Sequence, residues 1–247
     1  MTLFSHHEFR GHETVVFAHD AEAGLKAIIA IHNTARGPAV GGCRMWPYAD
    51  EQAALTDALR LSRGMTYKSA LADLPFGGGK SVIIGDSARD KTPALLRAMG
   101  RAVERLAGAY VIAEDVGTSM HDMDTVATTT RHVACTSAGS GDPSPYTAEG
   151  VLRGIQAAVQ YKLNRNAGDL DGLRVAVQGL GQVGFALCRH LHRLGAKLFV
   201  SDIAPERVRR AADELGAKVL SPDAIFDAEA DVFAPCALGG ILDERNI

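Results

Sequence analysis

The most constraining feature of the sequence is the glycine-rich turn GLGQVG at residues 179–184. The preceding run RVAVQ (174–178) has the composition of a buried strand, and a helical pattern follows the turn. The next predicted strand, KLFVSD, ends in Asp202. A G-x-G-x-x-G turn between a strand and a helix, with an acid at the end of the next strand, is the fingerprint of a Rossmann dinucleotide-binding fold.

Each part of this fingerprint has a separate physical role. Gly179 permits the tight turn, Gly181 lets a pyrophosphate approach the backbone, and Gly184 allows the helix to pack closely on the strand. The helix N-terminus offers N–H groups to the phosphates. Asp202 would accept hydrogen bonds from the adenosine ribose and disfavour a 2′-phosphate, so we expect NAD as the cofactor. The residues predicted to bind it are Gly179, Leu180, Gly181, Gln182, Val183, Gly184, Asp202 and Ile203.

The chain reads as an α/β protein with two domains, residues 1–145 and 146–247. The first half alternates strands with helices, and the second is a Rossmann domain with about four strands where a complete one has about six. The stretch AGSGDPSPYTAE (138–149) is the predicted linker, with a helix from residue 148. Predicted strands in the first half cover residues 26–32, 80–85 and 110–118, and predicted helices cover residues 50–72, capped by Asp50, and 92–108, capped by Thr92.

Composition excludes several classes of function. The formal net charge of -3 gives no basic field for nucleic acid, and no apolar run is long enough to span a membrane. Four scattered cysteines and an N-terminus without a signal-peptide pattern favour the cytoplasm. His6, His7 and His12 lack metal-ligand spacing and are expected to be exposed; no metal site is predicted.

The stretch LPFGGGKS (74–81) raises the alternative of a phosphate-binding P-loop. That motif requires a glycine where Leu74 stands and a helix after the lysine, whereas a strand pattern follows Lys80. A lysine in a glycine-lined pocket is instead desolvated, which lowers its pKa and allows proton exchange near neutral pH. Lys68 and Asp115 complete a set suited to an amino acid: Lys68 for the α-carboxylate, Lys80 to polarise a carbonyl or activate water, and Asp115 to exchange protons with the amino nitrogen.

The sequence resembles the glutamate/leucine/phenylalanine/valine dehydrogenases along its whole length, and most closely the leucine dehydrogenases. The matching stretches are GPAVGGCRMW (37–46), RGMTYKSALADLPFGGGKSVIIG (63–85), AEDVGT (113–118), GSGDPSP (139–145), VQGLGQVG (177–184) and APCALGG (234–240). The resemblance implies reversible oxidative deamination of an L-amino acid to its 2-oxo acid and ammonia. It implies that Lys80 is the catalytic lysine, Asp115 the acid/base, and Lys68 the carboxylate ligand, in a pocket shaped by Gly42 and Met65.

Substrate choice has one readable clue. Glutamate enzymes of this family carry a lysine where this chain has Val40, which cannot pair with a side-chain carboxylate. Ala113 resembles the small pocket residue of the leucine enzymes. We therefore expect a branched-chain amino acid, with phenylalanine as the alternative.

The resemblance also implies homo-oligomers, often octamers, built through the first domain. Members of the family continue for roughly a hundred residues more, so the chain is expected to be a fragment. A truncated, non-catalytic NAD-binding remnant is the other alternative.

Overall fold

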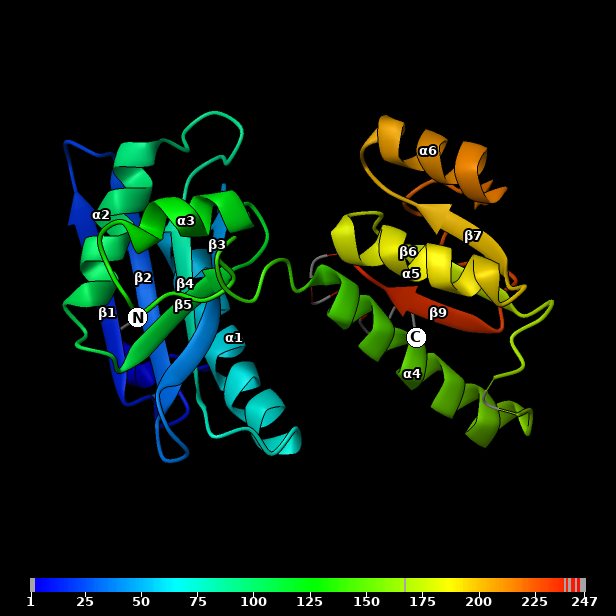
Figure 1. Ribbon diagram of the computed structural model, residues 1–247, viewed down its shortest axis with the longest axis horizontal. Helices are drawn as coiled ribbons and strands as arrows, with labels where there is room; N and C mark the ends of the chain where they lie inside the picture. Colours follow the sequence, from blue (N-terminus) through cyan, green and yellow to red (C-terminus); the bar gives the residue numbers. More distant parts are fainter. Residues whose placement is uncertain (1–2, 167, 238, 240, 243, 245–247) are drawn as a thin grey trace. The chain divides into compact units, whose positions relative to one another are not determined.

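The structure, a computed structural model, describes residues 3–166, 168–237, 239, 241, 242 and 244. The chain divides into two compact units, Met1–Asp142 and Pro143–Ile247, each with its own sheet (Figure 1). The division thus falls slightly before the boundary at residue 145 that the sequence suggested.

The first unit is a mixed five-stranded sheet with helices on both faces. Its elements are η1 (Leu3–Ser5), β1 (Thr14–Asp20), β2 (Leu25–Asn33), β3 (Ala39–Trp46), α1 (Glu51–Leu71), β4 (Gly77–Ile84), α2 (Pro93–Glu104), β5 (Tyr110–Glu114) and α3 (Met120–Ala127). The strand order is β1-β2-β4-β3-β5, in which β3 runs parallel to both β4 and β5. Strand β4 therefore lies in the middle of the sheet.

The sequence predicted β2, β4 and β5 but not β1 or β3. Strand β3 contains Gly41 and Gly42, and β4 begins at Gly77 rather than at Lys80, so three glycines belong to the strand and not to a loop. Because glycine is depleted in strands, the sequence pattern did not predict β3 or the first three residues of β4 as strand. Its presence here reflects close packing: a Cβ on Gly78 would lie 2.1 Å from the backbone nitrogen of Thr66 in α1.

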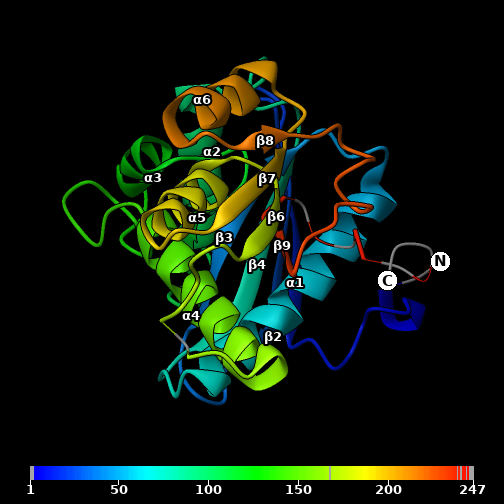
Figure 2. The ribbon, with the colours of Figure 1, turned by 90° about the vertical axis from the view of Figure 1, so that its right-hand side faces the viewer.

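Two apolar layers enclose this sheet. Helices α2 and α3 cover one face with residues such as Met99 and Met123, and α1 covers the other with Leu55 and Leu59. Figure 2 shows the strands between α1 on one side and α2 with α3 on the other. Asp50 and Thr92 cap α1 and α2 as expected, while α2 ends at Glu104, earlier than predicted.

The N-terminal histidines differ from expectation. His6 and His12 are buried, and only His7 is exposed. The His12 ring lies 4.8 Å from the ring of His32, and its Nε2 is 3.0 Å from the carbonyl oxygen of Leu59 in α1. Packing against α1, rather than solvation, therefore determines their environment.

The second unit is a parallel sheet with helices. It contains α4 (Ser144–Leu163), β6 (Arg174–Gln178), α5 (Gln182–Arg193), β7 (Lys197–Ser201), α6 (Pro205–Leu215), β8 (Lys218–Val219) and β9 (Val232–Pro235). Helix α4 begins inside the predicted linker, at Ser144. Proline is tolerated in the first turn of a helix, so the proline-rich stretch starts the helix instead of delaying it.

The strand order β8-β7-β6-β9 is that of the first four strands of a doubly wound dinucleotide-binding fold, which agrees with the four strands counted from the sequence. The glycine turn follows β6, where the strand order reverses. In the motif at 234–240, Leu238 and Gly240 lie outside the described residues.

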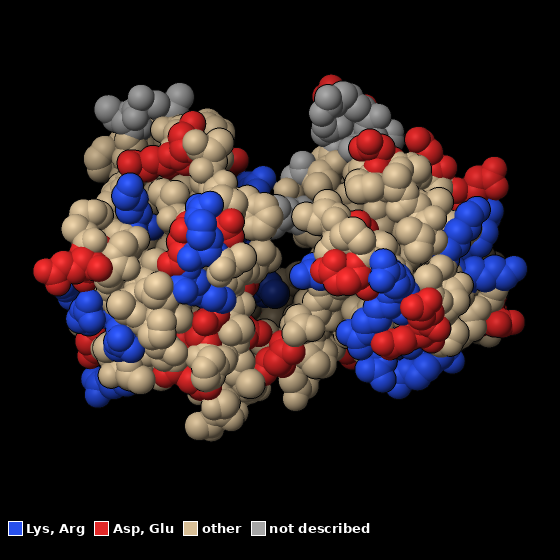
Figure 3. Space-filling model, turned by 90° about the horizontal axis from the view of Figure 1, so that it is seen from above, with Lys and Arg blue, Asp and Glu red and all other residues tan. Residues whose placement is uncertain are grey.

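The surface carries both signs of charge. Figure 3 shows Lys and Arg side chains interspersed with Asp and Glu on the face in view. Within the described part of the chain, no helix has the combination of length and apolarity that crossing a bilayer requires.

Candidate functional site

Strand register brings three of the predicted catalytic and substrate residues together. Lys80 lies on β4, Gly42 on the neighbouring β3, and Asp115 directly follows β5. The Lys80 Nζ is 2.7 Å from Asp115 Oδ2. A Cβ on Gly42 would lie 2.7 Å from the Asp115 Cβ and 3.2 Å from Lys80 Nζ. Glycine at position 42 therefore leaves the space in which the ion pair forms.

Val40 and Ala113 belong to the same face of the sheet. Val40 pairs with Gly78, two residues before Lys80, and Gly42 pairs with Ala113. Because side chains alternate along a strand, Val40, Gly42, Lys80 and Ala113 point to one side. Val40 and Ala113 are half-buried, so this face offers apolar side chains beside the Lys80–Asp115 pair.

Burial governs the electrostatics of the pair. Lys80 is 6% exposed, and burial lowers its pKa despite the opposing attraction of Asp115. Burial alone would raise the pKa of Asp115, but the positive charges of Lys80 and Arg44 outweigh it and lower that pKa. Asp115 is thus an anion at neutral pH, while Lys80 releases its proton more readily than an ordinary lysine.

The two residues predicted on α1 stand apart from this cluster. Lys68 is exposed in the last turn of α1, and its ammonium makes no hydrogen bond or ion pair with another described residue. Met65 is half-buried. The neighbouring Thr66 packs directly on Gly78 of β4, so this end of α1 lies over the strand that carries Lys80.

Arg44 and Asp57 are functional candidates that the sequence reasoning missed. Arg44 Nε is 3.0 Å from Asp115 Oδ2, and its NH1 is 2.8 Å from Asp57 Oδ2 on α1. The signal lay in the stretch GGCR, in which the arginine stands two residues after Gly42 and therefore on the same face of β3. Asp57 carried no local signal.

The same geometry removes the P-loop alternative. Gly77–Lys80 belong to strand β4, which pairs with β2 on one side and with β3 on the other. These residues are therefore not an open loop that precedes a helix. A phosphate-binding loop requires that arrangement, in which backbone N–H groups are free to meet the phosphate.

The glycine turn of the second unit has the geometry that phosphate binding needs. Gly179 has φ +90°, and a Cβ on Gly184 would collide with the carbonyl oxygen of Gly179. A Cβ on Gly181, by contrast, would meet nothing within 4 Å. Gly181 is the N-cap of α5, and no side chain caps the first N–H groups of this helix. These features fit a pyrophosphate.

Asp202 lies at the end of β7 beside this turn. Its Oδ2 accepts a hydrogen bond of 2.6 Å from the Leu180 N–H, and its Oδ1 accepts one of 2.8 Å from the Ala204 N–H. Leu180 is buried, so it supports the turn through its backbone and side chain. Gln182 and Ile203 are exposed, and Val183 is half-buried. The Asp202 carboxylate therefore links the end of β7 to the glycine turn that follows β6.

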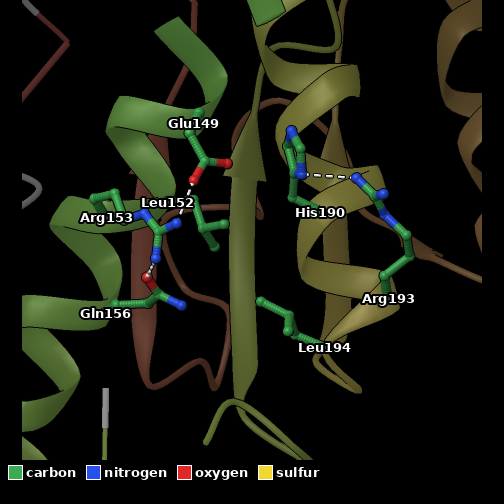
Figure 4. A pocket seen from close by; sticks show the side chains of 7 residues that line it. All are labelled: Glu149, Leu152, Arg153, Gln156, His190, Arg193 and Leu194. Carbon is green, nitrogen blue, oxygen red and sulfur yellow. Dashed lines mark hydrogen bonds and ion pairs between the residues drawn. The ribbon is translucent and has the colours of Figure 1, made fainter. Parts of the chain in front are cut away.

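A separate groove lies between α4 and α5, near the C-terminal end of α5, with a volume of about 340 Å³. Its polar side chains bond to one another, as Figure 4 shows: Arg153 to Glu149 at 2.8 Å, and Arg193 to His190 at 2.7 Å. It lies at the opposite end of α5 from the glycine turn. Among the described residues, no group of three or more His, Cys, Asp or Glu side chains could hold a metal ion.

Comparison with known proteins gives a consistent result. Residues 12–132 match the family described as "Glu/Leu/Phe/Val dehydrogenase, dimerisation domain". The leucine dehydrogenase of Geobacillus stearothermophilus is 53% identical over 100% of this chain and 68% of that protein.

Two solved structures also match. The L-tryptophan dehydrogenase of Nostoc punctiforme is 48% identical with a TM-score of 0.67, covering 96% of this chain and 67% of that one. The hetero-hexameric glutamate dehydrogenase of Thermus thermophilus, in a Leu-bound form, is 29% identical with a TM-score of 0.74, covering 94% and 63%.

Proposed function

Because this chain belongs to the Glu/Leu/Phe/Val dehydrogenase family and is an amino-acid dehydrogenase, we propose that it catalyses the NAD-dependent, reversible oxidative deamination of branched-chain L-amino acids. The observation that carries this proposal is the buried Lys80–Asp115 ion pair, 2.7 Å long, on the sheet face that also presents Val40 and Ala113. The overall reaction consumes the amino acid, NAD⁺ and water and yields the 2-oxo acid, ammonium, NADH and a proton.

Lys80 and Asp115 divide the proton transfers. The cofactor, when bound, accepts a hydride from the substrate α-carbon, which leaves an imine on the substrate. Lys80 in its neutral form accepts a proton from the water that attacks this imine carbon, and burial favours that neutral form. Asp115 accepts a proton from the substrate ammonium and later returns it to the nitrogen of the carbinolamine that the water forms. Ammonia then departs as the carbinolamine hydroxyl releases its proton and becomes the carbonyl of the 2-oxo acid.

Lys68 and the apolar positions select the substrate. The exposed ammonium of Lys68 has no partner among the described residues and is available for the α-carboxylate, with Met65 and Gly42 shaping the pocket. Val40 takes the place of a cation, so a glutamate side chain would leave an unpaired carboxylate against an apolar residue. Leucine, valine and isoleucine avoid that cost.

The glycine turn and Asp202 would hold the cofactor. The α5 N-terminus and the open space at Gly181 suit the pyrophosphate. Asp202 Oδ2 also lies 3.7 Å from the NH1 of Arg207, and each carboxylate oxygen has a second lone pair beyond its backbone hydrogen bond. A ribose with free hydroxyls suits this anion better than one with a 2′-phosphate, and NAD is the preferred cofactor on that ground.

The family match and the cysteines bear on self-association and location. The matched family is named for dimerisation, and a glutamate dehydrogenase relative is hexameric. We infer that this protein forms homo-oligomers through its first unit, with an octamer as the state to test by light scattering. All four cysteines are unpaired, which suits the cytoplasm.

The direct test is NADH formation by the purified protein with L-leucine, L-valine, L-isoleucine, L-phenylalanine, L-tryptophan and L-glutamate. We expect turnover with the branched-chain substrates and none with glutamate. Preferred turnover of an aromatic substrate would refute the substrate choice, and turnover of glutamate would refute the argument from Val40. A protein that binds NAD but oxidises none of these substrates would instead be the non-catalytic remnant.

A further inference from the structure

Arg44 connects the Lys80–Asp115 pair to helix α1. Its side chain is 11% exposed, and its guanidinium reaches two carboxylates: Asp115 Oδ2 at 3.0 Å from Nε and Asp57 Oδ2 at 2.8 Å from NH1. These two aspartates belong to different elements, one following β5 and the other on α1. The planar guanidinium thus links three parts of the first unit at the sheet face that carries Lys80.

The side-chain contacts on Asp115 are unevenly distributed between its two oxygens. Both Lys80 and Arg44 contact Oδ2. No side chain that the structure describes forms a hydrogen bond or ion pair with Oδ1, and 23% of the Asp115 side chain is exposed. The backbone N–H of Val116 also donates to this carboxylate. Oδ2 is therefore held by two cations, and because a carboxylate oxygen has two lone pairs, Oδ1 can accept from a substrate donor in addition to any backbone contact.

Asp57 is itself held firmly. Its Oδ2 accepts a hydrogen bond of 2.7 Å from the Tyr48 hydroxyl, and its Oδ1 accepts one of 3.0 Å from Arg60. Only 12% of its side chain is exposed. Because both oxygens of Asp57 are occupied, it anchors the far side of the Arg44 guanidinium.

We propose that Arg44 is a positioning residue of the deamination reaction, which holds Asp115 by Oδ2 against Lys80 and leaves Oδ1 to meet the substrate amino group. This inference rests on the proposed function for the identity of the reaction. Arg44 has no contact with the substrate or the cofactor in this role; it acts through Asp115 and, by its charge, on Lys80.

The positive charge of Arg44 affects the protonation of both Asp115 and Lys80. It lowers the pKa of Asp115 and also opposes protonation of Lys80. The other titratable or charged groups that the structure describes near this pair are Cys43 on β3, Tyr110 and Glu114 on β5, Asp57 and Arg60 on α1, Tyr48 before α1, and Asp122 on α3 with its partner Lys91. Burial raises the pKa of Cys43 to about 12, so its thiol stays neutral. Arg44 is the cation that contacts Asp115 besides Lys80.

Two variants separate the charge of Arg44 from its shape. Arg44→Gln removes the charge, so the rise of kcat/KM with pH, which reflects Lys80 losing its proton, should move to higher pH by about one unit. Arg44→Lys keeps a charge but not the planar fork that reaches both aspartates. Its profile should stay near that of the wild type while kcat falls by about tenfold or more. Arg101→Gln, which breaks an exposed pair with Asp20, is the matched control and should change neither.

The readings distinguish this inference from the proposed function. An inactive wild-type protein would refute the function, and an NMR titration of the Lys80 side chain, assigned from its loss in Lys80→Ala, would still report the effect of Arg44. An active wild type together with an unshifted Arg44→Gln profile and Lys80 titration would overturn the inference. Full kcat in Arg44→Lys would also overturn it, and this variant stays informative if Arg44→Gln does not fold.

Discussion

The side chains of Lys80 and Asp115 meet across strand β3, which separates the strands from which they come. They can do so because the residue between them, Gly42, has no side chain: a Cβ there would lie 2.7 Å from the Asp115 Cβ and 2.7 Å from the Glu114 carbonyl oxygen. The ion pair therefore depends on a glycine as much as on its two charged members.

Gly42→Ala should separate this pair. The added methyl group must displace Asp115 or Lys80, and a shift of about 1 Å can reduce kcat by about 100-fold. Steady-state kinetics will measure this loss. Gly64→Ala is the control and should keep full activity, because Gly64 is an exposed residue of α1 and a Cβ there would meet nothing within 4 Å. Wild-type kcat in Gly42→Ala would contradict the role of this glycine.

Lys80→Ala should reduce kcat by about 10² to 10⁴-fold, since the base that activates water is lost. NAD binding to the second unit, followed by nucleotide fluorescence titration, should persist. Lys91→Ala is a matched control: Lys91 also lies 2.7 Å from a carboxylate, that of Asp122 in the same unit. Equal losses in both variants would indicate that the ion pairs support only the fold.

Val40→Lys should shift the substrate preference toward glutamate. Val40 shares a face with Lys80. The ammonium of a lysine at position 40 could pair with the side-chain carboxylate of glutamate, but it would not suit the isobutyl group of leucine. We expect the ratio of kcat/KM for glutamate to that for leucine to rise by about tenfold or more. Val40→Gln controls for size without charge and should lose leucine activity without gaining glutamate activity.

Asp202→Asn should weaken NAD binding by about tenfold, because a hydrogen bond to a charged group is lost. It should also reduce discrimination against NADP. An amide has only one acceptor oxygen, so it cannot keep both backbone contacts, to Leu180 and to Ala204. Isothermal titration with both cofactors, alongside the exposed-site variant Asp213→Asn, would measure the change. Unchanged affinities for both cofactors would remove Asp202 from the cofactor site.

His12 should make the stability of the protein pH-dependent. Burial lowers its pKa below the ordinary 6.5, so the folded state binds fewer protons than the unfolded chain between the two values. The stability it contributes is therefore complete above about pH 6.5 and is lost as pH falls toward the lowered pKa. Urea unfolding of His12→Gln should show a smaller loss of stability from pH 7.5 to pH 5.5. His19→Gln, an exposed site on β1, should keep the wild-type slope.

The sequence alone determined the features that neighbouring residues specify. The strand, glycine turn, helix and acid of the second unit occupy about 30 consecutive residues, and each requirement of the turn is met within that span. The caps of α1 and α2 are equally local, since Asp50 and Thr92 bond to N–H groups three residues later. Lys80 and Asp115 were predicted as site residues from their local motifs and Gly42 from the family resemblance, and the structure brings the three together.

Only the tertiary structure decided what depends on strand register and packing. Arg44 reaches Asp115 because β3 lies between β4 and β5. Asp57 reaches Arg44 because α1 packs on this face of the sheet. His12 is buried because α1 covers it, although its local sequence looks solvated. These contacts join residues dozens of positions apart, and a local pattern carries no information about which distant strand or helix will lie alongside it.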